Sequence, residues 1–205
     1  MFERPITWRK LGRILTPRQD LWWNQTHMSL PTADVRAGGI VRIYFGGRDN
    51  LNRSRVGWVE IDPENPDQPP VMSEQPALDL GELGTFDDNG VMPCSVAHTG
   101  EEMRLYYVGW NPRATTRFSF FSGLAISRDD GRTFSRHSRA PILERTDREP
   151  FVNASPMVLF DRNLWRMYYV SGEGWIHPDR PKYNIKYAES DDGLIWRREG
   201  HICVG

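Results

Sequence analysis

The sequence predicts an all-β fold, a partial β-propeller of three four-stranded antiparallel blades. The first observation is an internal repeat, because the similar segments IYFGGRD, LYYVGWN and MYYVSGE begin at Ile43, Leu105 and Met167, at one constant interval. The second is that short runs of β-branched and aromatic residues alternate with Gly, Asp and Asn, which is typical of strands joined by turns. Four antiparallel strands per repeat, arranged radially, make the blade of a propeller.

Two further landmarks follow the same period. A proline precedes each of the three segments, at Pro31, Pro93 and Pro156, and these prolines keep the interval to within a single position. Downstream, Gly131 and Gly193 are separated by the same interval. Independent landmarks that share one period indicate copies of one structural unit.

The period places blades at about 27–82, 88–144 and 150–205 of a single domain that spans 1–205. In the second copy the expected strands cover 92–98, 103–110, 121–127 and 134–138, and in the third 155–161, 165–172, 184–190 and 196–202. Propellers typically have about four to eight blades. We therefore expect an incomplete propeller, with exposed blade faces through which the chain could self-associate.

The turn between the third and fourth strands has a defined chemistry. Ser127–Phe134 reads SRDDGRTF, which fits the Asp-box pattern S-x-D-x-G-x-T-aromatic, and Ser190–Trp196 reads SDDGLIW, a slightly shorter version. Asp favours such turns because its side chain bonds nearby backbone groups, and Gly favours them because it accepts a positive φ. We expect both segments to be structural turns.

Composition and charge argue against several classes of function. The formal net charge of −1 gives no reason to expect a nucleic-acid or membrane partner. No apolar run reaches the length of a membrane span, and the first residues lack the apolar core of a signal peptide, so a cytoplasmic location is the default expectation. Two cysteines are too few for a disulfide framework, and the five histidines lack HxxxH or HExxH spacing. We expect no metal and no cofactor.

The repeats resemble a known group of proteins. The stretches LGRILTP, HMSLPTA, RIYFGGRD, GTFDDNGVMPCSV, GLAISRDDGRTF, EPFVNASPMV, WRMYYVSGEGW and IKYAESDDGLIW run from Leu11 to Trp196. They are similar to those of bacterial glycosyl-hydrolase-like proteins with the five-bladed propeller of arabinanases, β-xylosidases, invertases and levansucrases (glycoside hydrolase families 43 and 32). The resemblance implies a glycoside-hydrolase-like protein that acts on or binds an oligosaccharide. It also implies roughly two more blades in a full member.

Enzymes of that superfamily hold three carboxylates near the pore, one on the inner strand of each of the first three blades, commonly just before a proline. In this sequence the residues before the matching prolines are Leu30, Met92 and Ser155, none of which can donate or accept a catalytic proton. The resemblance therefore implies the fold, whereas catalysis would have to use carboxylates at other positions.

The expected topology still indicates where a ligand would bind. The loops before each inner strand and after each second strand share one rim, which we call the mouth. These loops carry aromatic residues that can pack on a sugar ring and polar residues that can bond its hydroxyl groups. The expected substrate-binding residues are Asn24, His27, Arg48, Asp49, Trp110, Arg148, Asn153, Glu173, Trp175 and His177.

Glycoside cleavage usually needs two carboxylates that flank the bond. The predicted catalytic residues are Asp88 or Asp87 together with Glu149, because their loops come from adjacent blades and could face each other across the pore. The structural alternative is that Asp87 and Asp88 form an Asx-turn before Asn-Gly, and that Glu149 is a loop charge paired with Arg148.

Other functions also remain open at this point. A carbohydrate-binding propeller without catalysis is favoured by the residues that precede the three prolines. Between Arg113 and Arg148 there are eight arginines and no lysine. Because the guanidinium fork suits carboxylate or phosphate, Arg113, Arg145 or Arg148 could bind an anionic sugar, or phosphate in a phosphorolytic reaction. The arginines and the Asp-box turns would also permit a sialidase-like propeller.

Overall fold

The computed structural model describes residues 7–8, 10, 12–100 and 102–205, and its regular structure is almost entirely β-strand. The first group of strands is β1 (Met28–Val35), β2 (Val41–Arg48), β3 (Ser54–Ile61) and β4 (Val71–Met72), with a 3-10 turn, η1 (Ala37–Gly39), between β1 and β2. The second group is β5 (Val91–Thr99), β6 (Glu102–Pro112), β7 (Phe118–Ser127) and β8 (Ser135–Arg136). The third is β9 (Asn153–Asp161), β10 (Leu164–His177), β11 (Arg180–Ser190) and β12 (Ile202–Val204).

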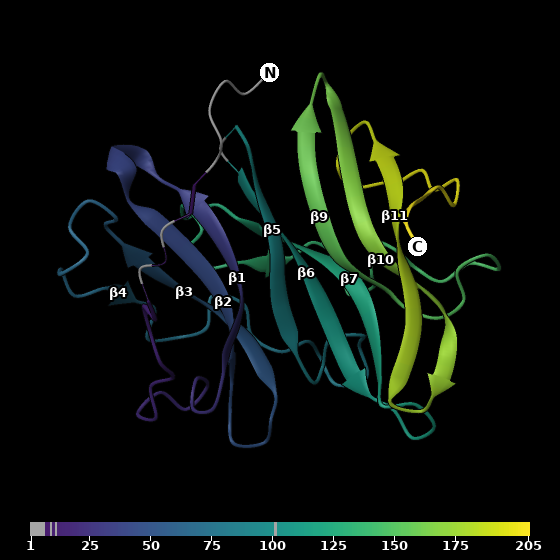
Figure 1. The fold of residues 1–205 in the computed structure, drawn as a ribbon, viewed down its shortest axis with the longest axis horizontal. Coiled ribbons are helices and arrows are strands. Elements are labelled where there is room, and N and C mark those ends of the chain that lie inside the picture. Colours follow the sequence, from purple (N-terminus) through teal and green to yellow (C-terminus); the bar gives the residue numbers. More distant parts are fainter. Residues whose placement is uncertain (1–6, 9, 11, 101) are drawn as a thin grey trace.

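Within each group, consecutive strands pair antiparallel. A single parallel bridge between Phe121 and Asn153 joins β7 to β9, so the second and third groups form one eight-stranded sheet beside the four-stranded first sheet. Figure 1 shows the three groups side by side, in a surface that curls along the chain. The predicted all-β class is confirmed, and the arrangement fits part of a β-propeller.

The outermost strands are shorter than predicted. The strand expected at 134–138 is reduced to β8. In place of the strand expected at 196–202 there are an isolated bridge between Arg197 and Glu189 and the later strand β12. Gly200 has a φ of 77°, which is incompatible with a continuous strand and interrupts the pairing between these two points. That part of the strand prediction is wrong.

The apolar core lies between neighbouring groups of strands. Adjacent residues of a strand point to opposite faces, so Tyr106 and Tyr107 of β6 enter different clusters. Tyr107 packs with Tyr44 and Leu105 against the first group, and Tyr106 packs with Met167 of the third group. Both rings are fully buried, so the second group is covered on both faces.

Hydrogen bonds repeat at these two interfaces. The hydroxyl of Tyr44 donates to the carbonyl of Gly131 at 2.9 Å, and the hydroxyl of Tyr106 donates to the carbonyl of Gly193, also at 2.9 Å. In each case the tyrosine of one group bonds the aspartate-glycine turn of the next. The tyrosine at the equivalent position of the third group, Tyr168, is 37% exposed, and its hydroxyl makes no hydrogen bond with the described residues. The expectation of self-association through an exposed face stays a prediction.

Each inner strand is irregular at its proline. The pairing register shifts near Pro31 in β1, near Pro93 in β5 and near Pro156 in β9. Proline has no N–H to donate to the ladder, so a bulge is the usual way to accommodate it in a sheet. Leu30 and Ser155, which precede two of these prolines, take φ values of 54° and 53° and are exposed.

Three hairpin loops lie together at the lower edge of Figure 1, those of β2–β3, β6–β7 and β10–β11. This edge corresponds to the predicted mouth. Within the described residues, no helix has the length and apolar character needed to cross a membrane.

Candidate functional site

A cavity of about 460 Å³ opens at the mouth between the first and second groups of strands. Its walls come from the β2–β3 loop, from the residues before β5 and from both arms of the β6–β7 hairpin. We call it the mouth pocket. It is lined by Arg48, Leu51, Asn52, Asn89, Met92, Trp110, Pro112, Arg117, Phe118 and Phe120.

The indole of Trp110 is held in place on two sides. Its Nε1 donates to the hydroxyl of Ser54 at 3.2 Å, and that hydroxyl donates to the carbonyl of Val91 at 3.0 Å. On the other side is Gly90, where an added Cβ would lie 1.7 Å from the indole nitrogen. Only glycine leaves room for the ring, so Gly90 and Ser54 together fix one aromatic wall of the pocket.

The other aromatic wall is a stack. The rings of Phe118 and Phe120 lie 4.0 Å apart and nearly parallel, and Trp175 from β10 packs edge-on against Phe118 at 5.2 Å. Phe118 and Phe120 alternate with Ser119 on β7, so their side chains share a face of the strand. The third group of strands therefore supports this wall, although Trp175 does not itself line the pocket.

Arg48 and Arg117 are the cationic residues of the lining. Arg48 ends β2, and its Nη1 donates to Asn52 Oδ1 at 2.9 Å. Its Nε is buried and has no hydrogen-bond partner among the described residues. Arg117 is exposed, and neither arginine forms a salt bridge within the described part of the chain.

Asp87, a predicted catalytic residue, is fully buried in a network of donors. Its Oδ2 accepts from the hydroxyl of Tyr107 at 2.9 Å and from Nε of Arg136 at 2.7 Å. Its Oδ1 accepts from the hydroxyl of Thr85 at 3.0 Å. Burial is the main reason why the pKa of Tyr107 is raised, and the negative charge of Asp87 adds to it. The carboxylate thus ties the loop before β5 to β6 and β8.

Glu149, predicted as its catalytic partner, has the same environment one repeat later. It is 3% exposed, and it accepts from the hydroxyl of Tyr169 at 2.8 Å, from Arg198 at 2.7 Å and from Lys186 at 3.1 Å. Burial is again the largest cause of the raised pKa of Tyr169. The suggested pairing with Arg148 is wrong, because Arg198 and Lys186 hold this carboxylate.

The two networks are equivalent, because carboxylate, tyrosine and arginine each recur at the period of the repeat: Asp87 and Glu149, Tyr107 and Tyr169, Arg136 and Arg198. Such repetition is expected of a structural network that holds each loop against its own sheet. Neither carboxylate lines the mouth pocket. The catalytic roles of these residues stay predictions.

Asp88 differs from its neighbour. It is half-buried, and its Oδ2 accepts from the backbone N–H of Gly84 at 2.8 Å while Oδ1 accepts from Asn111 at 2.5 Å. The Asx-turn suggested for Asp87 and Asp88 is wrong, because neither carboxylate accepts from a backbone N–H further along the chain among the described residues, and Asp88 bonds Gly84 instead. Gly84 and Asn111 line a separate open hollow on the other side of the β6–β7 hairpin, together with Arg113 and Arg145.

The acidic side chains predicted to bind substrate are engaged by cations. Asp49 accepts from Arg53 and Arg55 at 2.9 Å. Burial acts to raise the pKa of Asp49, but hydrogen bonds from the backbone of Arg53 and from both guanidinium groups outweigh it and hold the pKa below its usual range. Lys182 lowers the pKa of Glu173, with a contribution from the amide of Asn184.

The remaining predicted residues lie apart from the pocket lining. His27 is exposed and bonds Thr26 at 2.9 Å, and His177 is exposed and bonds Asp179 at 2.5 Å. Arg148 is exposed. Asn24, in the loop before β1, and Asn153, at the start of β9, are fully buried.

Sequence reasoning missed most of the pocket lining. It identified Arg48 and Trp110, but Asn52, Phe118 and Phe120 were not singled out. One signal was present, because alternate aromatic residues at the start of a strand indicate an apolar face at that end. Met92 also lines the pocket, so one of the pre-proline positions where relatives were expected to hold carboxylates does face the cavity.

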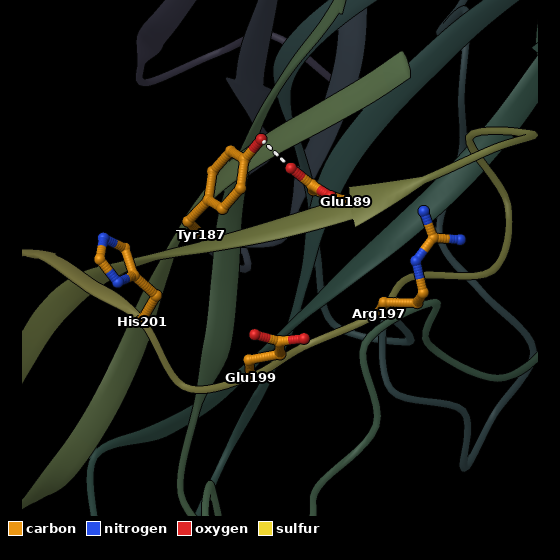
Figure 2. A pocket seen from close by; sticks show the side chains of 5 residues that line it. All are labelled: Tyr187, Glu189, Arg197, Glu199 and His201. Carbon is orange, nitrogen blue, oxygen red and sulfur yellow. Dashed lines mark hydrogen bonds between the residues drawn. The ribbon is translucent and has the colours of Figure 1, made fainter.

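A third cavity, a hollow of about 340 Å³, lies on the outer strands of the third group (Figure 2) and is lined by Tyr187, Glu189, Arg197, Glu199 and His201. Figure 2 shows the hydroxyl of Tyr187 directed at Glu189, with a hydrogen bond of 2.8 Å. Arg197 pairs with Asp191. Tyr187, Glu189 and Arg197 are thus engaged within the protein, and the hollow lacks the aromatic walls of the mouth pocket.

Comparison with known proteins gives a close relative. No family model matches the chain. Two Mycobacterium tuberculosis proteins, "Uncharacterized protein MT1551" and "Uncharacterized protein Rv1502", are each 38% identical over 200 residues, which cover 97% of this chain and 67% of the relative. The chain belongs to the MT1551 family.

Solved structures with a similar fold include several glycoside hydrolases. One described as "Glycoside hydrolase" has a TM-score of 0.71 at 17% identity, over 96% of this chain and 62% of its own. The family 117 glycoside hydrolase Zg3597 of Zobellia galactanivorans has a TM-score of 0.65 at 14% identity, over 90% and 49%. The Bombyx mori GH32 β-fructofuranosidase BmSUC1 has a TM-score of 0.61 at 16% identity, over 83% and 34%. This MT1551-family chain thus spans less than two thirds of each of these structures and shares their fold.

Proposed function

We propose that this MT1551-family protein binds an oligosaccharide in the mouth pocket of a propeller of the five-bladed type. The observation that carries the proposal is the composition of the pocket: aromatic walls of Trp110 and the Phe118–Phe120 stack enclose side chains that can bond hydroxyl groups, including Asn52 and Asn89. Flat apolar faces pack against the C–H faces of sugar rings, and a few convergent polar groups set orientation.

The size and position of the cavity support the same conclusion. About 460 Å³ falls within the range of small-molecule sites, and the pocket lies between the β2–β3 and β6–β7 hairpins, at the mouth. The glycoside-hydrolase fold of the neighbours makes a carbohydrate the ligand class to test first.

Binding is the role that the described side chains support best. A glycosidase needs one carboxyl group that can deliver a proton and a second that acts as base or nucleophile. Asp87 and Glu149 are both occupied by guanidinium and tyrosine donors in matching networks. Met92, which lines the pocket, has no ionisable group.

A hydrolase remains the second candidate, and Asp88 favours it. Of the three predicted catalytic carboxylates, Asp88 alone has no cationic partner among the described residues, and it is partly accessible. In this candidate Asp88 acts with Glu149 as the acid/base pair. Turnover of aryl-glycosides or oligosaccharides, with and without phosphate, that is lost in Asp88→Asn would establish it in place of simple binding.

The binding proposal is tested by calorimetry with a panel of oligosaccharides and three forms of the protein. We expect wild type to bind at least one, Trp110→Leu to bind it at least about tenfold more weakly, and Trp8→Ala to bind it normally, because Trp8 is 91% exposed and remote from the lining. Asn52→Gly, on the pocket rim, removes the amide at a position whose φ of 62° glycine accepts readily, so it carries little risk to folding. If no saccharide binds folded protein, or if binding ignores both pocket variants, the proposal fails.

A further inference from the structure

The charges around the mouth point to a narrower class of ligand. We propose that the mouth pocket selects anionic carbohydrates, with Arg48 and Arg117 binding a carboxylate or phosphate group on the sugar. This inference rests on the proposed binding function and adds the chemistry of the ligand. It begins from the lining itself, which includes two guanidinium groups and no carboxylate.

The acidic residues near the mouth do not offset these two charges. Asp49 is paired with both Arg53 and Arg55, and Asp87 is paired with Arg136. In the third group, Glu149 is paired with Lys186 and Arg198, and Glu173 is paired with Lys182.

Asp88 is the remaining predicted acid, and its oxygens are directed at Gly84 and Asn111, which line the hollow on the other side of the hairpin. Around the pocket, therefore, carboxylates are largely neutralised within the protein, whereas Arg48 and Arg117 have no ion-pair partner among the described residues.

The geometry of Arg48 fits an oxyanion. A guanidinium group offers Nε and Nη2 along one edge, and this edge matches two oxygens of a carboxylate or phosphate. Asn52 takes Nη1, which leaves that edge without a partner in the described structure. Because Nε is itself shielded from solvent, an oxyanion that engages both atoms requires the Arg48 side chain to turn toward the pocket, and the free energy cost of leaving a buried donor unpaired favours that movement.

Arg117 approaches the pocket from the opposite wall. Its backbone N–H donates to the carbonyl of Pro178 at 2.7 Å, which ties the β6–β7 hairpin to the β10–β11 loop. Phe118 follows directly and stacks on Phe120. A charged sugar can therefore place its ring on the aromatic wall while its anionic group meets the guanidinium groups.

The experiment uses pairs of ligands in which one member carries an anionic group and the other is neutral. Calorimetry compares a trisaccharide of galacturonic acid with its methyl ester, and glucose 6-phosphate with glucose, so that the two pairs separate carboxylate from phosphate recognition. We expect the anionic member of at least one pair to bind roughly ten- to hundredfold more tightly than its neutral partner, because charge-assisted hydrogen bonds contribute about that factor to affinity. We also expect this preference to shrink as salt is raised.

Substitutions test whether the two arginines cause the preference for anionic ligands. Arg48→Gln and Arg117→Gln should each reduce it about tenfold or more. Arg48→Lys keeps the charge but loses the planar fork, so it should recover only part of the loss. Arg128→Gln is the matched control, because Arg128 lies in the aspartate turn outside the lining and is well exposed.

The outcomes are distinct for the two proposals. Equal binding of charged and neutral partners, or stronger binding of neutral oligosaccharides, overturns the anionic preference and leaves the carbohydrate proposal standing. A preference that survives both glutamine variants overturns the assignment to Arg48 and Arg117. Failure to bind any saccharide, charged or neutral, removes both proposals together.

Discussion

The tyrosine series at the interfaces between groups of strands permits a prediction with an internal control. Tyr44, Tyr106 and Tyr168 occupy the same position in successive repeats. The first two are fully buried and donate to the carbonyls of Gly131 and Gly193, whereas Tyr168 is 37% exposed and has no such bond in the described structure. Replacement by phenylalanine removes the hydroxyl and keeps the ring.

The expected magnitude follows from this difference. In Tyr106→Phe a buried carbonyl loses its donor, which costs about 1–3 kcal/mol. Tyr44→Phe should cost a similar amount. Tyr168→Phe should change the free energy of unfolding by no more than about 0.5 kcal/mol, because its hydroxyl faces solvent. For a chain of this size a loss of about 1 kcal/mol lowers Tm by roughly 2–4 °C.

The assay is urea denaturation of all three variants beside wild type, with the slope of the transition compared as well as its midpoint. A lower midpoint with an unchanged slope is expected for Tyr44→Phe and Tyr106→Phe alone. The reasoning is refuted if Tyr168→Phe is as destabilising as the other two, or if all three variants match wild type. Either result would mean that these hydroxyl groups do not join neighbouring groups of strands.

Three more predictions address the anchors, the pocket and pH. Asp87→Asn should lower the free energy of unfolding by at least about 2 kcal/mol, and Glu149→Gln should do the same, because each leaves buried cations or donors poorly compensated; denaturation midpoints near wild type would contradict this. Gly90→Ala should displace the indole of Trp110, so that its fluorescence changes and saccharide binding falls at least about tenfold, since the new Cβ would lie 1.7 Å from Nε1; an unchanged emission spectrum would count against the steric argument. Because the pKa of Asp49 is lowered in the folded state, its stabilising contribution is complete above the unfolded pKa of about 3.9 and is lost as pH falls through the folded value. The free energy of unfolding of Asp49→Asn should therefore fall less than that of wild type when the pH is lowered below about 4, as measured by denaturation of both proteins over a series of pH values. An equal fall in both proteins would show that Asp49 does not supply this pH dependence.

The matching networks of Asp87 and Glu149 change how acidic residues in such repeats are interpreted. A carboxylate in a mouth loop is a natural catalytic candidate, because loops at one rim can converge on a ligand. Here both acids lie at the same position in consecutive repeats and bond an equivalent tyrosine and an equivalent arginine. In the first repeat the position equivalent to Asp87 is Gln25, so that repeat lacks the network.

The sequence by itself determined the repeat and the strand class. Segments such as those from Ile43, Leu105 and Met167 recur at a constant interval, and alternation of side chains along a strand is a local property that can be read without knowing what each strand packs against. The same period also indicated which loops share the mouth. These conclusions depend on neighbours in the chain, and the structure agrees with them in the all-β class and in most strand positions.

Only the tertiary structure decided which side chains remain available to a ligand. Asp87 and Glu149 are occupied because Arg136 and Arg198, at the same distance further along the chain in both cases, fold back onto them. Arg48 keeps a guanidinium edge unpaired because Asn52 takes the other side and no acid comes within reach among the described residues. Ion pairs between distant residues depend on how strands are brought together in space, and no local pattern in the sequence records that pairing.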